Sequence, residues 1–270
     1  MVEKLKEKES VEYIEEDSVN IEEVFALHGI NSGCCLKLLG KVVIVAFLVD
    51  DAESRWTDTA REKFVEVLKQ SADEIMRQSG FSKSKLMIAY AHCKVSVPYV
   101  VTRKNHENCV KDVLTQFGFG KISEYQKHYE KKFARDEAPM LFVFNKPFRS
   151  YAARAVCKSF HEKEAVTDAN EWAFISYKAE HENKNTLIHE LMHQFGAIDY
   201  YYPSQVKALA GAYFPGSIMD GGTVIDPLTR YVIGWDEELS PESKAFLRDI
   251  SSVSEEDVRL ALIEEWDKEF

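Results

Sequence analysis

The segment 187–199 reads LIHELMHQFGAID and holds side chains whose types and spacing could do chemistry. His189 and His193 are four residues apart, so on a helix their side chains lie one above the other. Two imidazoles placed in this way can converge on one zinc ion, at about 2.0–2.1 Å each. Glu190 is rotated by about 100° around the helix from His189, so its carboxylate can reach a water on the metal. The spacing therefore predicts a zinc site with Glu190 as its general base.

The residues around these three indicate a helix that packs on a core and then turns back. Apolar side chains recur at the spacing of one helix face, at Ile188, Leu191, Met192 and Phe195. Gly196 follows His193 by three residues, where a helix can end in a left-handed turn. Such a turn would bring Asp199 back towards the two histidines, because glycine adopts positive φ without steric cost. Two imidazoles and a carboxylate then leave one zinc position open, as catalytic zinc sites do.

The pattern H-E-x-x-H-x-x-G-x-x-D, followed by SIMD at 217–220, resembles the metzincin clan of metallopeptidases. The nearest variant has Asp as the third ligand, as in snapalysin-like enzymes. The resemblance implies a zinc ion bound by His189, His193 and Asp199, with Met219 beneath it. It also implies an N-terminal lobe that carries a sheet and is closed by the active-site helix.

The sequence departs from this family pattern at two positions. The commoner third ligand is histidine, and an anionic Asp199 should acidify the metal's water less strongly than a third imidazole would. Some of these families place a tyrosine two residues after the methionine, where this chain has Gly221. Any tyrosine that assists catalysis must therefore come from elsewhere, and the sequence leaves five candidates: Tyr200, Tyr201, Tyr202, Tyr213 and Tyr231.

Other residues compete for a place at the metal. Residues 222–234, GTVIDPLTRYVIG, resemble the segment in which aspzincins carry their third ligand, which would nominate Asp226 in place of Asp199. The spacing around Asp226 does not match that pattern, and Gly196 gives Asp199 a way back to the histidines, so Asp199 is preferred. Cys34 and Cys35 are a weaker alternative, as a thiolate that caps the zinc, against an ordinary role as buried thiols.

Hydrophobic patterns predict the elements that position this segment. Apolar runs indicate five strands, at 41–50, 86–95, 140–145, 152–158 and 171–178. Between the first two, Thr59 and Glu62 fit a capping box that opens an amphipathic helix ending near Gly80. Two helices are predicted within 106–135, another begins near Asn185, and helical segments return after Ser240.

The order of these elements predicts the fold class and the domain organisation. Strand, helix and strand over 41–95 form a βαβ unit, whose two strands are parallel. We predict an α/β fold (α+β in some schemes), with a mixed, mainly parallel sheet, flanking helices and a smaller irregular and helical C-terminal lobe. Residues 1–20 are rich in Glu and Lys and are expected to be disordered. Residues 21–270 should form a single metallopeptidase domain, whose sheet lobe ends at about 196 and whose second lobe covers 197–270.

Composition excludes several classes of partner. The formal net charge of −11 repels phosphate backbones, so nucleic-acid binding is not expected. The longest purely apolar stretch, 42–49, is far shorter than the roughly 18 residues of a membrane span. The charged first residues do not resemble a signal peptide, and the five cysteines include no C-x-x-C pair, which favours a reducing, cytoplasmic location. The chain would be secreted if a signal peptide had been removed.

These observations predict a zinc-dependent endopeptidase that hydrolyses peptide bonds through a metal-bound water and acts on a peptide or protein substrate. Two alternatives remain open. One is a catalytically inactive zinc-binding relative that serves as a peptide-binding module, and the other is a zinc hydrolase that acts on a different amide. The sequence does not predict the oligomeric state.

Overall fold

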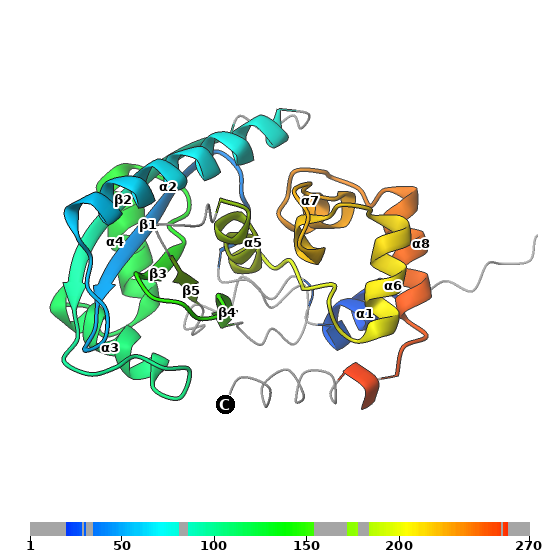
Figure 1. The fold of residues 1–270 in the computed structure, drawn as a ribbon. Coiled ribbons are helices and arrows are strands. Elements are labelled where there is room, and N and C mark those ends of the chain that lie inside the picture. Colours follow the sequence, from blue (N-terminus) through cyan, green and yellow to red (C-terminus); the bar gives the residue numbers. More distant parts are fainter. Residues whose placement is uncertain are drawn as a thin grey trace, which may run out of the picture.

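The computed structural model describes residues 20–28, 30, 35–80, 86–153, 172–177, 184–254 and 256–258. In Figure 1 the sheet and the helices that cover it form one side of the molecule. A second group of helices forms the other side, and one helix lies between the two groups. That central helix, α5 (Lys184–Gln194), carries the two candidate histidine ligands. In the part of the chain that the structure describes, no helix is long and apolar enough to cross a membrane.

The sheet contains five strands in the order β2-β1-β3-β5-β4. They are β1 (Lys41–Asp50), β2 (Met87–Ser96), β3 (Met140–Phe144), β4 (Tyr151–Ala153) and β5 (Trp172–Ser176). All neighbouring pairs are parallel except β4 with β5, which is antiparallel. The fold is therefore a mixed α/β fold with a mainly parallel sheet, as predicted.

Helices cover both faces of this sheet and form the second lobe. In the sheet lobe they are α2 (Asp58–Ser79), α3 (His106–Gln116) and α4 (Ile122–Phe133). The second lobe contains α6 (Ser204–Tyr213), the short 3₁₀ helix η2 (Ile218–Asp220), α7 (Pro227–Val232), α8 (Pro241–Ile250) and the N-terminal α1 (Ile21–His28). The C-terminal lobe is thus largely helical, and α1, α6 and α7 are helices that the sequence patterns did not identify.

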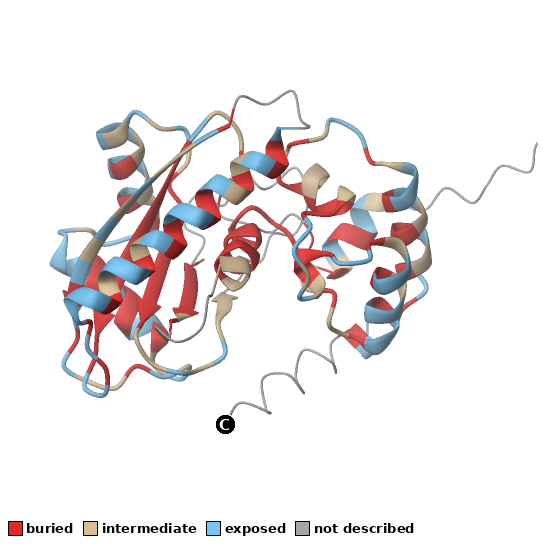
Figure 2. Cartoon of the chain, turned by 45° about the horizontal axis from the view of Figure 1, so that its top comes forward, coloured by how far each residue is buried: buried red, intermediate tan, exposed pale blue. Residues whose placement is uncertain are grey.

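Side chains of β1 alternate between two hydrophobic clusters, since successive residues of a strand point to opposite faces. One cluster contains Val43, Val45 and Phe47 with side chains of α3 and α4. The other contains Ile44, Ala46 and Leu48 with side chains of α2 and α5, and it continues into α6, α7 and α8. Figure 2 shows most of α5 as buried, and β1, β3 and β5 are buried strands, whereas β2 is mostly exposed or intermediate. The helix that carries the histidines therefore packs against the sheet on one side and the second lobe on the other.

Most predicted elements of the sheet lobe are confirmed, and one cap is wrong. The helix after β1 ends at Gly80 as expected, but Thr57, and not Thr59, is its N-cap: the Thr57 hydroxyl accepts a hydrogen bond from the Ala60 amide at 3.1 Å. Two helices lie within 106–135, as predicted. For the strand predicted at 152–158, only β4 is described, and residues 154–158 lie outside the described part of the chain. Disorder is predicted for residues 1–20, and all of these but residue 20 also lie outside the described part of the chain.

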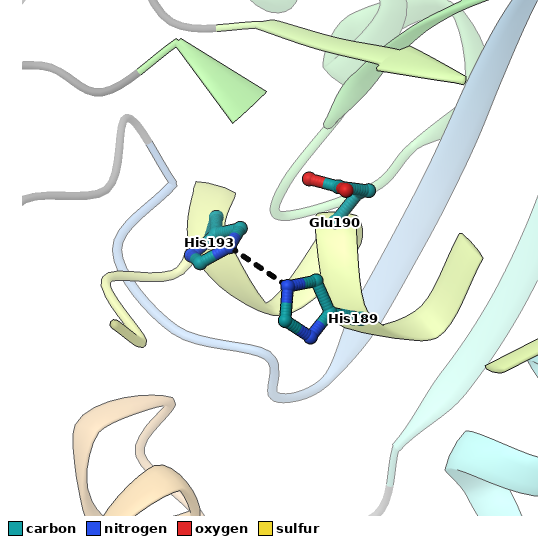
Figure 3. Close-up of side chains that lie close together, drawn as sticks. All are labelled: His189, Glu190 and His193. Atoms are coloured by element: carbon teal, nitrogen blue, oxygen red, sulfur yellow. Dashed lines mark hydrogen bonds between the residues drawn. The ribbon is translucent and has the colours of Figure 1, made fainter. Parts of the chain in front are cut away.

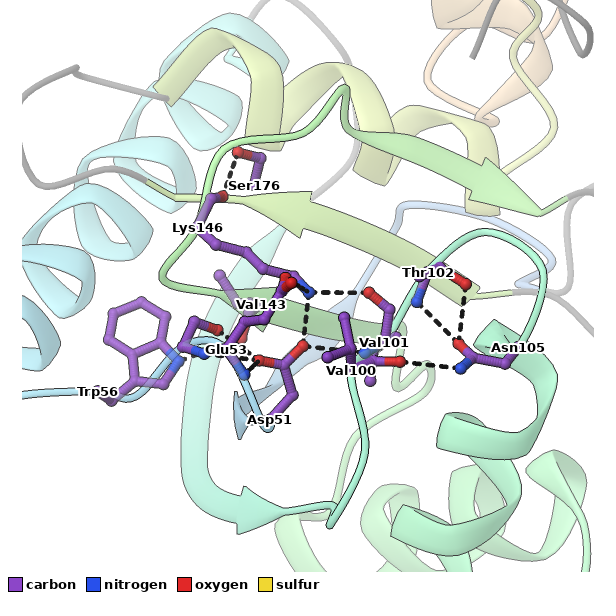
Figure 4. Close-up of polar contacts among 11 residues, drawn as sticks. Asp51, Glu53, Trp56, Val100, Val101, Thr102, Asn105, Val143, Lys146 and Ser176 are labelled. Carbon is purple, nitrogen blue, oxygen red and sulfur yellow. Dashed lines mark hydrogen bonds and ion pairs between the residues drawn. The ribbon is translucent and has the colours of Figure 1, made fainter. Parts of the chain in front are cut away.

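A buried ion pair joins the carboxyl ends of β1 and β3 (Figure 4). The ammonium of Lys146 donates to Asp51 at 2.5 Å and to the carbonyl oxygen of Val101 at 2.8 Å. Burial alone would raise the pKa of Asp51, but hydrogen bonds from Lys146, Val101 and Ser54 lower it below its ordinary value. Asp51 also accepts hydrogen bonds from the amides of Glu53, Ser54 and Val101, so we assign the pair a structural role.

Candidate metal centre

Helix α5 holds the candidate ligands in a buried setting. His189 is 8% exposed, Glu190 4% and His193 3%. The helix packs against α2, β5, β4 and η2. At its C-terminal end the side-chain oxygen of Gln194 accepts a hydrogen bond from the amide of Met140 at 2.8 Å, which ties the helix to β3. The two histidines are therefore presented by a helix that is anchored to the central sheet.

The chain reverses after α5 as the sequence predicts. Gly196 has φ of +97°, the left-handed region that favours glycine, and its amide donates to the carbonyl of His193 at 2.8 Å. The reversal places Oδ1 of Asp199 2.9 Å from Nε2 of His189 and 3.3 Å from Nε2 of His193. The Asp199 side chain is 22% exposed, but the Oδ1 atom that faces the histidines is buried.

Both imidazoles are oriented through their other ring nitrogen. Nδ1 of His189 donates to the carbonyl oxygen of Ile218 at 2.8 Å, and Nδ1 of His193 donates to that of Ala197, also at 2.8 Å. A carbonyl oxygen only accepts, so Nδ1 carries the proton in each ring and Nε2 of the neutral ring is a bare lone pair. Metal-binding histidines in proteins are held in the same way.

The three inward atoms are spaced as ligands of one metal ion are. The two Nε2 atoms lie 3.2 Å apart (Figure 3), and the two distances to Asp199 are 2.9 and 3.3 Å. Two ligands bound at about 2.0–2.1 Å to a tetrahedral zinc ion lie about 3.3 Å apart. Two bare lone pairs this close repel each other unless a cation or a proton lies between them, so the residues fit a metal ion.

The electrostatics of these side chains also favour a positive charge between the three inward atoms. Burial alone would lower the pKa of His189, but the hydrogen bond to Asp199 and the charge of that carboxylate outweigh burial and raise this pKa to about 9. Burial alone would raise the pKa of Asp199, whereas positive charge on His193 and a hydrogen bond from His189 bring it well below its ordinary range. The three side chains therefore stabilise positive charge at the point where their atoms meet.

Glu190 belongs to the same group without joining the triangle. Its carboxylate lies within 4.8 Å of a ring nitrogen of each histidine, and among the described residues these three form a group that could hold a metal ion. Oδ1 of Asp199 lies 2.9 Å and 3.3 Å from the Nε2 atoms of His189 and His193. Both carboxylates, those of Asp199 and Glu190, therefore lie beside the pair of histidines.

The turn that contains Met219 lies against this centre. Helix η2 supplies the Ile218 carbonyl that orients His189, and the carbonyl of Met219 accepts a hydrogen bond from the Tyr200 amide at 3.0 Å. The Met219 side chain is fully buried in the cluster that also contains Met192 and Phe195 of the α5 region. The turn thus contacts the first histidine and the residue that follows Asp199.

One of the five candidate tyrosines lies beside the metal centre. The ring of Tyr201 stacks on His189, with centroids 5.7 Å apart and planes 26° apart. Its hydroxyl would lie 3.8 Å from a β-carbon at Gly221, so it occupies the space beside that glycine in the turn. Burial and the charges of Asp199 and Glu190 raise the pKa of Tyr201, which keeps its hydroxyl protonated and able to donate.

The rival ligands are engaged elsewhere. The carboxylate of Asp226 caps helix α7 and accepts hydrogen bonds from Tyr200, Ser217 and Thr229. Cys35 is buried, and its sulfur accepts a hydrogen bond from Gln126 at 3.9 Å; Cys34 lies outside the described residues. Sequence reasoning missed the carbonyls that orient the histidines, because any residue type supplies a carbonyl and only the backbone path places it.

Comparisons with known proteins add little to this picture. No protein-family model matches the chain, and no curated protein matches it. Among solved structures, metalloproteinase-II from Bacteroides fragilis resembles it with a TM-score of 0.37 and 10% identity, over 78% of this chain. The match covers 59% of the length of that structure, and similarity at this level carries no weight for function. Fold and side chains define an α/β protein with a candidate metal centre.

Proposed function

We propose that the chain is a zinc-dependent endopeptidase whose metal is held by His189, His193 and Asp199. The observation that carries this proposal is the triangle of Nε2, Nε2 and Oδ1 atoms, whose sides are 2.9 to 3.3 Å. Two imidazoles and one carboxylate with an open fourth position are the donor set of catalytic zinc sites. The H-E-x-x-H spacing and its resemblance to metzincins support the same reading.

The roles of the side chains follow from their positions. A zinc ion at this centre would polarise the scissile carbonyl and acidify a water. Glu190, buried beside the two histidines, takes a proton from the attacking water and passes it to the amine that leaves. Tyr201, with a protonated hydroxyl next to His189, donates a hydrogen bond to the carbonyl oxygen as negative charge develops on it.

The edge of the sheet offers a place for an extended peptide. Among the described residues, β4 is the last strand in the sheet order, pairs with β5 alone, and packs near α5. An edge strand has backbone donors and acceptors that an added strand can pair with. We propose that a peptide substrate aligns along β4, which would bring its backbone past Glu190.

Elemental analysis of protein purified without added metal tests the metal. We expect about one zinc ion per chain. If the protein binds no stoichiometric metal, even after zinc is offered to the apoprotein, the proposal is refuted. Two histidines and a carboxylate also bind Fe(II) in some enzymes, so finding iron in place of zinc would reject the zinc assignment.

Glu190→Gln tests the reaction, because it removes the base and keeps all three proposed ligands. We expect the variant to retain its fold and zinc but to lose nearly all cleavage of a peptide library. Cleavage at the parent's rate would show that Glu190 is not the base. A parent that binds zinc but cleaves neither peptides nor simple amides would favour the peptide-binding module. A parent that hydrolyses only simple amides would favour the other amide hydrolase.

A further inference from the structure

A buried carboxylate that the proposed chemistry does not use is hydrogen-bonded to the segments that carry the metal centre. Asp226 is 2% exposed. Its Oδ1 accepts from the Tyr200 hydroxyl at 3.2 Å and the Thr229 amide at 3.0 Å. Its Oδ2 accepts from the hydroxyls of Ser217 and Thr229, both at 2.7 Å. Among the described residues no basic side chain pairs with it, so hydrogen bonds alone hold this carboxylate.

Two of these four donors belong to the segments that present the metal ligands. Ser217 is the N-cap of η2, and its hydroxyl oxygen also accepts from the Met219 amide at 3.1 Å. The next residue, Ile218, supplies the carbonyl that orients His189. The Asp226 carboxylate therefore binds Ser217, and the next residue in the chain, Ile218, supplies the carbonyl that accepts from His189.

The other donor leads to the third ligand. Tyr200 follows Asp199 directly, is fully buried, and bonds to Asp226 through its hydroxyl. Its amide donates to the carbonyl of Met219 at 3.0 Å. Asp226 thus joins, through two hydroxyl groups, the turn behind His189 and the segment that carries Asp199.

We propose that Asp226 is a positioning residue for the metal centre: its carboxylate fixes the η2 turn through Ser217 and the Asp199 segment through Tyr200. This inference rests on the proposed metal site. Without the carboxylate, the Ile218 carbonyl and Asp199 could shift independently. The Nε2 and Oδ1 atoms would then meet at ligand spacing for only part of the time. Loss of partners that orient metal ligands weakens metal binding by about 10- to 100-fold in other proteins.

Single-group variants separate this role from simple support of the fold. Ser217→Ala and Tyr200→Phe each remove one hydroxyl that joins Asp226 to the centre. Thr229→Val is the matched control, because it removes a hydroxyl bond to the same carboxylate and leaves in place the two bonds, from Tyr200 and Ser217, that join Asp226 to the centre. None of the three substitutions touches a proposed ligand, and Asp226→Asn changes the carboxylate directly with little change of shape.

The measurements are the melting temperature of each apoprotein and its zinc affinity, by competition with a chromophoric chelator. We expect Ser217→Ala, Tyr200→Phe and Asp226→Asn to bind zinc about tenfold or more weakly than the parent. Thr229→Val should stay within about threefold of the parent while its melting temperature falls to a similar degree. If Asp226→Asn fails to fold, the two hydroxyl variants decide the question.

Two results would overturn the inference. One is parent-like zinc affinity in both hydroxyl variants, and the other is an equal loss of affinity in Thr229→Val, which would mean that affinity only follows stability. Both differ from failure of the proposed function, in which the parent itself would bind no zinc.

Discussion

Oδ1 of Asp199 lies 2.9 Å from Nε2 of His189, although the two residues stand on opposite sides of the chain reversal at Gly196. The reversal turns a pair of histidines on one helix into a group of three ligand atoms. This geometry places the carboxylate of Asp199 next to both histidines, whereas that of Asp226 caps helix α7.

Asp199→Ala should weaken zinc binding by more than about 100-fold, because losing a ligand costs more than losing a group that only orients one. The apoprotein should fold, since this side chain is partly exposed. Competition with a chelator measures the affinity, and circular dichroism checks the fold. Zinc affinity equal to that of the parent would show that another residue completes the site.

Gly196→Ala should destabilise the protein by about 1–2 kcal/mol, because an L side chain at φ of +97° is strained. Zinc binding should weaken too, since the turn places Asp199. Gly211→Ala is the control: it lies in α6, no atom is within 4 Å of the added β-carbon, and it should stabilise by about 0.4–1 kcal/mol. Chemical denaturation measures the stability of both glycine variants. Equal changes in stability would contradict the role given to the turn.

Tyr201→Phe should lower kcat by about 100-fold if its hydroxyl donates to the developing oxyanion. Zinc content should be unchanged, because the tyrosine is not a ligand and its ring still stacks on His189. Tyr231→Phe, whose ring packs against Phe25, is the control and should keep full activity. A parent-like kcat in Tyr201→Phe would remove this residue from the mechanism.

Glu137→Gln should alter how stability depends on pH. Burial raises the pKa of Glu137 from 4.5 to about 7, while a hydrogen bond from the Leu36 amide opposes that shift. A carboxyl whose folded pKa is raised stabilises the fold below its unfolded pKa and loses that contribution as pH rises through the folded pKa. The parent should therefore lose stability between about pH 4.5 and 7, by at most about 3 kcal/mol.

The glutamine variant should lack this loss, so its stability relative to the parent should rise across the same interval. Urea denaturation of both proteins at several pH values measures the difference. A difference that stays constant from pH 4.5 to 8 would mean that Glu137 is ionised throughout and that its burial does not govern its titration.

Local sequence determined the strands of the sheet lobe and the ligand-bearing helix. The central strands β1 and β3 are apolar runs buried on both faces, and a parallel sheet between helix layers needs such runs. Helix α5 was predictable because its apolar spacing, its histidine pair and the glycine that follows are local features. For the same reason the sequence could predict Asp199 as a ligand, since a left-handed turn so close to a helix end limits the directions that the chain can take.

The remainder of the site depends on contacts between segments far apart in the chain, and no local pattern contains them. The Ile218 carbonyl that orients His189 is a backbone group, so its residue type gives no signal. Nor does any spacing distinguish Tyr201 from the other tyrosines, because its place beside His189 follows from how the segment after Asp199 packs. Asp226 looked in the sequence like a rival ligand. Only the tertiary structure surrounds its carboxylate with Tyr200, Ser217 and Thr229, because packing the second lobe against α5 buries this side chain and makes each of its lone pairs find a donor.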